Sequence, residues 1–339
     1  MPNDARGDVL KVWLYAAVSV TLGAWISPLL YNAGKALAEI SANKVTNGII
    51  EQIAEICRAA DFSKFYEAEI LIAACLLFFP WMEWAHARCA DAFLGISGPW
   101  KARLEDGAST TTLGRRLLVN LRSLWLTCVG FLIMAGLLII PGIALMCARH
   151  SMHSPAGGVF SMALHILAVV VIPAAIMEIF FRGLVMGVFL RSMRPSAALG
   201  MSAAFFAIVL SLITAPGLNV ADPEATGIGF ELLGKSIERF ADWKMIVTTF
   251  APLLMLGGVL GYARLRTASL GMPVGLHIGW LAANGLLDTL HQGTVTPGGI
   301  RAPENVSLLQ QGFIPLVAIV LTAVMVHLLT PHDDSPSDP

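Results

Sequence analysis

Long stretches without charged residues recur along the whole chain. Seven of them contain no Asp, Glu, Lys or Arg, and an eighth stretch, 70–87, contains only Glu83. The seven uncharged runs are 12–34, 123–148, 150–177, 195–221, 245–263, 267–287 and 305–332. Each is near or above the ~18–20 apolar residues that cross the hydrocarbon core of a membrane. The pattern therefore predicts eight membrane-spanning segments.

Helices are the expected form of these segments. A spanning segment must satisfy its own backbone hydrogen bonds, and none of the eight alternates apolar and polar positions as a barrel strand does. The first run, 12–34, exceeds the ~7–15-residue core of a signal peptide, so we expect a retained anchor. We predict an all-α, polytopic membrane protein, a bundle of about eight transmembrane helices.

The spans divide into two groups, and a tail follows them. Residues 1–158 hold about three membrane helices and an interfacial segment, residues 159–330 hold the remaining spans, and the acidic tail 331–339 is expected to be disordered. The distribution of Lys and Arg favours an N-terminus on the cytoplasmic side. We expect an integral multi-pass protein of the cytoplasmic (plasma) membrane.

Two connecting segments have an apolar stripe at helical spacing. In 45–57 the stripe is Val45, Ile49, Ile53 and Ile56, and in 229–242 it is Phe230, Leu233, Ile237 and Phe240. Both segments are typical of helices that lie on the membrane surface. A helix packed over the end of the bundle is the alternative for each.

Composition agrees with this picture and excludes other classes. The 339 residues are 56% hydrophobic and 13% charged, against about 25% charged residues in an average soluble domain. The net charge of −1 lacks the basic field on which nucleic-acid binding depends. The lipid bilayer is thus the expected surrounding, and no nucleic-acid partner is expected.

A pair of charges lies inside the most apolar block of the chain. Residues 159–190 would form a helix of about 48 Å, longer than a ~30 Å hydrocarbon core, and Pro173 is the expected place for a kink. Glu178 and Arg182 follow it, four residues apart on one helical face. An ionised residue at mid-membrane costs roughly 2.5–3.5 kcal/mol on insertion scales. The pair is either part of a polar reaction centre or a structural clip between helices.

A histidine in another span adds to the pair. His277 lies in Gly-Leu-His-Ile-Gly-Trp at 275–280, within the uncharged run 267–287. An isolated intramembrane histidine usually takes part in packing, but one beside a Glu–Arg pair is a candidate functional residue. If the three form a site, Glu178 and His277 must lie within about 10 Å of each other, because a base has to reach its water.

At these residues the chain resembles a family of membrane proteases. Met-Glu-Ile-Phe-Phe-Arg-Gly at 177–183 resembles the motif E-E-x-x-F-R-G, and 275–280 and 250–270 resemble later segments of the same family. The family is that of CAAX prenyl protease 2 and the lysostaphin-resistance-like proteins, the CPBP intramembrane proteases. The similarity covers roughly 159–290.

The resemblance implies catalytic roles for Glu178, Arg182 and His277. In the family, the first Glu of the pair and a histidine of a second motif activate water, while the later histidine and an Asn stabilise the oxyanion. Here Met177 replaces the first Glu, Leu210 replaces the second-motif His, and Leu281 stands at the Asn position. We therefore predict a catalytically impaired endopeptidase homologue that acts on or binds a membrane-associated peptide or lipidated tail.

No cofactor or metal is expected, because the chain has no H-E-x-x-H or similar ligand spacing. The alternative to a protease homologue is a non-enzymatic membrane scaffold or a small transporter. A transporter of the inverted-repeat kind would have paired interrupted helices, and the sequence indicates one interruption, near Pro173.

Overall fold

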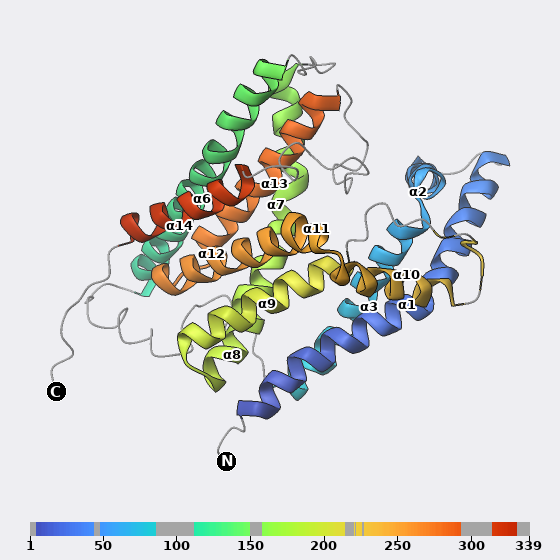
Figure 1. The fold of residues 1–339 in the computed structure, drawn as a ribbon, viewed down its shortest axis with the longest axis horizontal. Helices are drawn as coiled ribbons and strands as arrows, with labels where there is room; N and C mark the ends of the chain where they lie inside the picture. Colours follow the sequence, from blue (N-terminus) through green and yellow to red (C-terminus); the bar gives the residue numbers. More distant parts are fainter. Residues whose placement is uncertain are drawn as a thin grey trace. The chain divides into compact units, whose positions relative to one another are not determined.

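The computed structural model describes residues 5–43, 48–85, 112–149, 158–213, 220, 222–225, 227–292 and 314–330, and every regular element within them is a helix (Figure 1). The long helices are α1 (Ala5–Asn43), α3 (Phe62–Trp84), α6 (Thr112–Arg149), α7 (Val159–Glu178), α9 (Pro195–Ile213), α12 (Ala251–Thr267), α13 (Gly271–Gln292) and α14 (Ile314–Leu329). The predicted all-α architecture is confirmed. The predicted boundary near residue 158 stays a prediction, and the tail 331–339 lies outside the described residues.

Six stretches of helix among the described residues are long and apolar enough to cross a membrane. They are Gly7–Asn43, Phe62–Trp84, Asn120–Ala148, Val159–Ser192, Pro195–Ile213 and Trp243–Thr267. The polytopic membrane fold is thus confirmed, whereas the count of eight is not. α14 is apolar but has only 16 residues. α13 has 22 residues, but its glycines and polar side chains make it less apolar than a typical span.

The long block 159–190 is one helix with an irregular centre. α7 stays α-helical through Pro173, and a π-helical segment, η1 (Ile179–Val185), then leads into α8 (Met186–Ser192). The amide of Met186 donates to the carbonyl of Phe181, five residues earlier. The change in the helix therefore follows Glu178 instead of falling at Pro173. Such π turns inside α-helices are frequent at functional sites.

The chain forms two compact units, which we describe separately. The first unit contains Ala87–Ala207 and Ala251–Pro339, together with Met1–Ala5. In it α13 packs along both α6 and α7, and α14 packs on α12 and α6 (Figure 1). The second unit contains Arg6–His86 and Ile208–Phe250.

Glycines bring α13 close to α6 in the first unit. Gly271, Gly275 and Gly279 recur every four residues and face the backbone of Ser123, Thr127 and Phe131 in α6. A Cβ added to Gly279 would lie 2.8 Å from the Phe131 carbonyl oxygen, and one added to Gly275 would collide with the Thr127 carbonyl. Small residues at this spacing let membrane helices approach closely. The glycine face of α13 thus fixes the helix against α6.

The two amphipathic segments have different surroundings in the second unit. The first forms α2 (Gly48–Ala59), where Ile49, Ile53 and Ile56 are exposed. The second forms α10 (Ile228–Glu238) and the short elements η2 (Arg239–Ala241), α11 (Trp243–Met245) and η3 (Ile246–Phe250). α10 packs into the core of the unit through Ile228 and Leu232. Phe230 and Ile237 of the predicted stripe are 42% and 55% exposed, so α10 packs through a different face. Which of the two alternatives holds for the stripe stays a prediction. The surface position of α2 stays a prediction.

Candidate functional site

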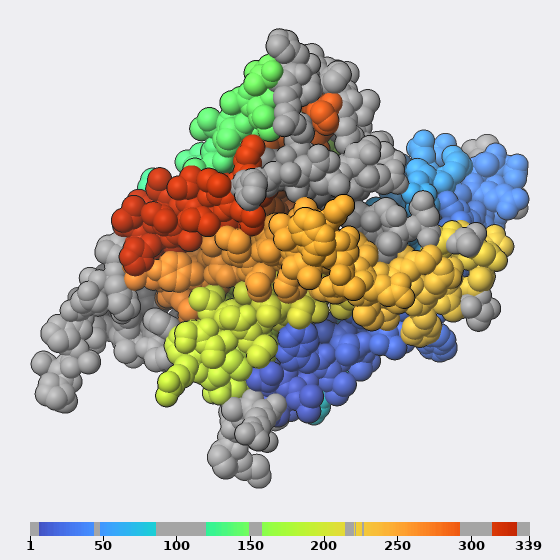
Figure 2. All heavy atoms as spheres, in the orientation of Figure 1, coloured from blue at the N-terminus to red at the C-terminus, as the bar shows by residue number. Residues whose placement is uncertain are grey.

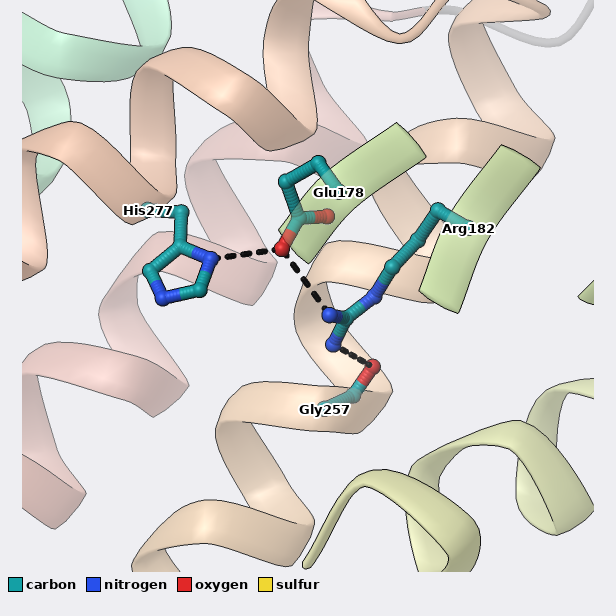
Figure 3. A network of polar contacts seen from close by, with 4 residues as sticks. All are labelled: Glu178, Arg182, Gly257 and His277. Atoms are coloured by element: carbon teal, nitrogen blue, oxygen red, sulfur yellow. Dashed lines mark hydrogen bonds and ion pairs between the residues drawn. The ribbon is translucent and has the colours of Figure 1, made fainter. Parts of the chain in front are cut away.

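The structure brings together the three residues that the sequence singled out. Oε1 of Glu178 lies 2.6 Å from Nδ1 of His277 and 2.9 Å from Nη1 of Arg182 (Figure 3). Glu178 and His277 are 99 residues apart in the sequence. One carboxylate oxygen therefore joins two helices through two hydrogen bonds. The catalytic role of the three residues stays a prediction.

Local structure explains how each side chain reaches this point. Glu178 is the last residue of α7, and Arg182 lies in the π-helical segment η1 that follows it. His277 lies between Gly275 and Gly279 in α13. Because residues two apart point to nearly opposite sides of an α-helix, the glycine face that contacts α6 leaves His277 on the side of α7.

All three side chains are removed from solvent. Glu178 is 0%, Arg182 1% and His277 2% exposed. Charges in such surroundings must be paired and hydrogen-bonded, because the desolvation of an isolated ion is strongly unfavourable. The contacts form a Glu–Arg–His network that meets this requirement in part. Within the described residues, Oε2 of Glu178 and Nε of Arg182 have no hydrogen-bond partner.

The hydrogen bond to His277 also fixes the roles of its ring nitrogens. An ionised carboxylate can only accept, so Nδ1 carries the proton and donates to Glu178. Nε2 is then the nitrogen that remains for a ligand.

Two further residues complete the surroundings of Arg182. Nη2 of Arg182 donates to the carbonyl oxygen of Gly257 at 3.3 Å, and the guanidinium lies 4.2 Å from the ring centre of Phe206. The same ring meets His277 edge-on, with the ring centres 6.1 Å apart. A cation over an aromatic face is a favourable arrangement. Arg182 is therefore held by an ion pair, a carbonyl group and an aromatic ring.

Gly257 and Phe206 were not predicted as site residues from the sequence. A Cβ on Gly257 would lie 3.1 Å from both Ala203 Cα and Phe206 Cδ1, so glycine is what allows α12 to approach α9 here. Phe206 lies four residues before Leu210, which stands at the position of the second-motif His, and this was the signal available for it. For Gly257 the only signal was its position in the family-like segment 250–270.

The residues that replace the family's catalytic groups carry no titratable side chain. Met177 is the half-buried neighbour of Glu178 in α7, and Leu281 follows His277 by four residues in α13. Leu210 lies in α9, four residues after Phe206. Asn284 donates to the carbonyl of Trp280 in its own helix, at 2.7 Å. None of the three replacements can accept or donate a proton.

The other histidines that the structure describes lie apart from this network. His165 is on an exposed face of α7, His291 is exposed in the last turn of α13, and His327 is 2.8 Å from the hydroxyl of Tyr262. His86, His150, His153 and His332 lie outside the described residues. Within the described ranges, no group of three or more His, Cys, Asp or Glu side chains is placed to hold a metal ion.

Comparison with known proteins identifies one family. Residues 159–283 match the family model described as type II CAAX prenyl endopeptidase Rce1-like. Comparison with curated proteins and with solved structures gives no match. The matched range contains Glu178, Arg182, Phe206, Gly257 and His277. The resemblance inferred from the sequence motifs is therefore confirmed for this part of the chain.

Proposed function

Taking residues 159–283 as an Rce1-like domain of the type II CAAX prenyl endopeptidases, we propose that the protein is a catalytically impaired member of this group that binds a membrane-associated peptide or lipidated tail. One observation carries the proposal. The buried carboxylate of Glu178 already accepts from both Arg182 and His277 through one oxygen. Its immediate neighbour Met177 cannot take its place.

Water activation needs a free base within hydrogen-bond reach of the water. A general base contributes typically 10²–10⁴-fold, and the loss of coupled members of one site removes most of the chemistry. Both family positions that would activate water are apolar here, namely Met177 and Leu210. The residues that match the family are those that hold the network together and would stabilise an oxyanion. A retained network without the two water-activating residues favours binding of the peptide over its cleavage.

The unpartnered atoms of the network support a peptide as the ligand. Oε2 of Glu178 is an acceptor and Nε of Arg182 is a donor, and both face away from His277 (Figure 3). A peptide group offers the complementary pair, an N–H and a carbonyl oxygen. A peptide that satisfied both atoms would remove the free-energy cost of leaving them buried without partners.

The test compares binding and cleavage of one farnesylated peptide by the purified protein in lipid nanodiscs. We expect the wild type to bind the fluorescent peptide and to leave it uncut. His277→Ala should weaken binding of the peptide about tenfold, since it removes the charge-assisted hydrogen bond that orients the Glu178 carboxylate. His165→Ala, an exposed histidine of α7, is the matched control and should bind normally.

A gain of activity tests the impaired site directly. Met177→Glu combined with Leu210→His should cut the peptide, and the same double variant carrying Glu178→Gln shows whether Glu178 takes part. Cleavage by the wild type that is abolished by Glu178→Gln would refute the impaired site. Absence of peptide binding by a folded wild type would refute the proposed ligand and favour a scaffold. If Glu178→Gln and His277→Ala lose only thermal stability, the network is a structural clip.

A further inference from the structure

Helix α12 ends beside the start of α9 in the first unit. A Cβ added to Gly257 would lie 3.1 Å from Cα of Ala203, and one added to Gly261 would lie 2.6 Å from a side-chain carbon of Leu199. Residue numbers rise along α12 as they fall along α9, so the two helices are antiparallel. Figure 2 shows α12, in orange, next to α8 and α9, in yellow-green. The last turn of α12 therefore lies at the level of the first turn of α9.

Arg264 lies on this contact face of α12, in the last turn of the helix. It follows Gly257 by about two helical turns, which returns it to within about 20° of the same direction. Its Nη1 is buried and has no hydrogen-bond partner. A guanidinium stays charged at physiological pH, and a buried donor without an acceptor is costly. Arg264 thus presents a cation whose buried donor lacks an acceptor.

The neighbouring arginine, Arg266, is held by the protein. It donates to the carbonyl oxygen of His327 at 3.2 Å and to that of Thr330, and its guanidinium lies 5.9 Å from the ring centre of Tyr262. These contacts fasten the end of α14 to the end of α12. Arg266 therefore has a structural role, which the contacts of Arg264 do not provide for that residue.

Acidic side chains do not balance the arginines at this end of the unit. In the part of the first unit that the structure describes, the acidic residues are Glu178 and Asp288. Glu178 belongs to the buried network, and Asp288 is about 25 Å along α13 from Gly271, where α13 begins. Arg191 in the last turn of α8 and Arg194 just before α9 add positive charge. The end that contains the last turn of α12 therefore attracts anions.

The first turn of α9 adds donors at the same level. Its first intrahelical bond runs from the amide of Ala198 to the carbonyl of Arg194, at 2.9 Å, so the amides of Ser196 and Ala197 precede the helical bonds. Arg194 cannot cap these amides through its side chain, which has no acceptor. Residues 194–197 are exposed. Free amides at a helix N-terminus are a favourable place for a phosphate group.

From the unpartnered donor of Arg264 at the level of this open first turn, we infer that this end of the first unit binds the phosphate group of an anionic phospholipid. Arg264 lies near the end of the membrane-spanning stretch Trp243–Thr267, where lipid headgroups meet the protein. A phosphate accepts charge-assisted hydrogen bonds from a guanidinium in a well-matched geometry. Basic sites between membrane helices bind anionic headgroups in this way.

Thermal unfolding in an uncharged detergent tests the site with three probes. Dihexanoyl-phosphatidylglycerol is the anionic lipid, dihexanoyl-phosphatidylcholine carries the phosphate together with a neutralising choline, and inorganic phosphate is the soluble source. We expect the anionic lipid to raise the unfolding midpoint of the wild type more than either other probe at equal concentration. Arg264→Gln should need at least about tenfold more anionic lipid for the same rise, because a charge-assisted hydrogen bond is lost.

Arg122→Gln is the matched control. Arg122 is an exposed arginine of α6 and precedes Ser123, which contacts Gly271 at the same end of the unit. This variant loses the same charge and should respond to the anionic lipid as the wild type does. An equal loss of response in both variants would show attraction by net charge alone and overturn the site.

Measurements without lipid separate a binding site from a structural role. Arg264→Gln should then unfold at or above the midpoint of the wild type, since it removes a charge with an unpartnered buried donor. A clear fall in the midpoint would show that Arg264 holds the fold and overturn the site. Equal stabilisation by inorganic phosphate would replace the lipid with a soluble anion. Stabilisation that appears only in Asp333→Asn combined with Asp334→Asn would assign Arg264 to the acidic tail and overturn the lipid.

Discussion

Two regions of the molecule hold a pair of opposite charges, and the surroundings of the two pairs differ. In the first unit, Glu178, Arg182 and His277 contact one another and are at most 2% exposed. In the second unit, the paired side chains of Glu231 and Lys235 are 47% and 36% exposed. The first pair of opposite charges is thus buried, whereas the second stays exposed. The burial of a charged pair therefore does not by itself show whether the pair is a functional site or a structural ion pair.

Removal of Arg182 should have the largest effect on this contrast. Arg182→Ala leaves the Glu178 carboxylate buried and without its cation, which costs about 3–5 kcal/mol. We expect loss of folded, monodisperse protein or a large fall in the thermal unfolding midpoint in detergent. An unchanged midpoint would mean that Glu178 is hydrated in the folded protein and would remove the difference between the two regions.

The glycine contact behind His277 should come next. Gly275→Ala places a methyl group against the Thr127 carbonyl, and overpacking of this kind costs typically about 1–3 kcal/mol. Gly136→Ala in α6 is the control, since a Cβ there meets no atom within 4 Å. Thermal unfolding of the two variants should differ by this amount. Equal midpoints would show that α13 can move away from α6 without loss of stability.

The aromatic support of Arg182 should contribute less. Phe206→Leu keeps an apolar side chain and removes the ring beneath the guanidinium, a contact of about 0.5–2 kcal/mol. The comparison variant is Phe205→Leu, which alters a ring that packs on Phe181 and Phe189. The difference between their unfolding free energies measures the cation–π term. A larger loss of stability in Phe205→Leu would show that α9 stabilises the protein chiefly through core packing.

The smallest effect is expected in the second unit. Lys235→Ala breaks an ion pair that is open on both sides, and exposed pairs contribute about 0–1 kcal/mol. The unfolding midpoint should therefore stay within a few degrees of the wild type. A loss comparable to that of Arg182→Ala would show that the Glu231–Lys235 pair is desolvated.

The sequence predicted the helices and the members of the network better than their surroundings. Uncharged runs predict spans because each helix satisfies its own backbone, a local requirement. Glu178, Arg182 and His277 were identified because charged and polar residues are costly within such runs. Arg264 was missed, since it directly follows the uncharged run 245–263, where an arginine is expected. Its unpartnered donor depends on the packing of α12 against α9, which is tertiary.

The same limit applies to Phe206, Gly257 and α10. An aromatic residue in an apolar helix has the same pattern in a core as beneath a guanidinium, and only the arrangement of α9 against η1 distinguishes them. The amphipathic pattern of 229–242 predicted a helix with one apolar face. The residues of α10 that pack against α1 are Ile228, Gly229 and Leu232, whereas Phe230 and Ile237 of the predicted stripe are exposed.

The π turn after Glu178 has a consequence for the numbering of this helix. A turn closed by a bond to the fifth residue back holds one residue more than an α turn, so η1 acts as a one-residue insertion within α7–α8. Deletion of one residue from 179–185 would return the helix to regular geometry. Everything after it would rotate by about 100° relative to Glu178. Alignments that pair this helix without a gap therefore match Arg182 correctly only to sequences that carry the same extra residue.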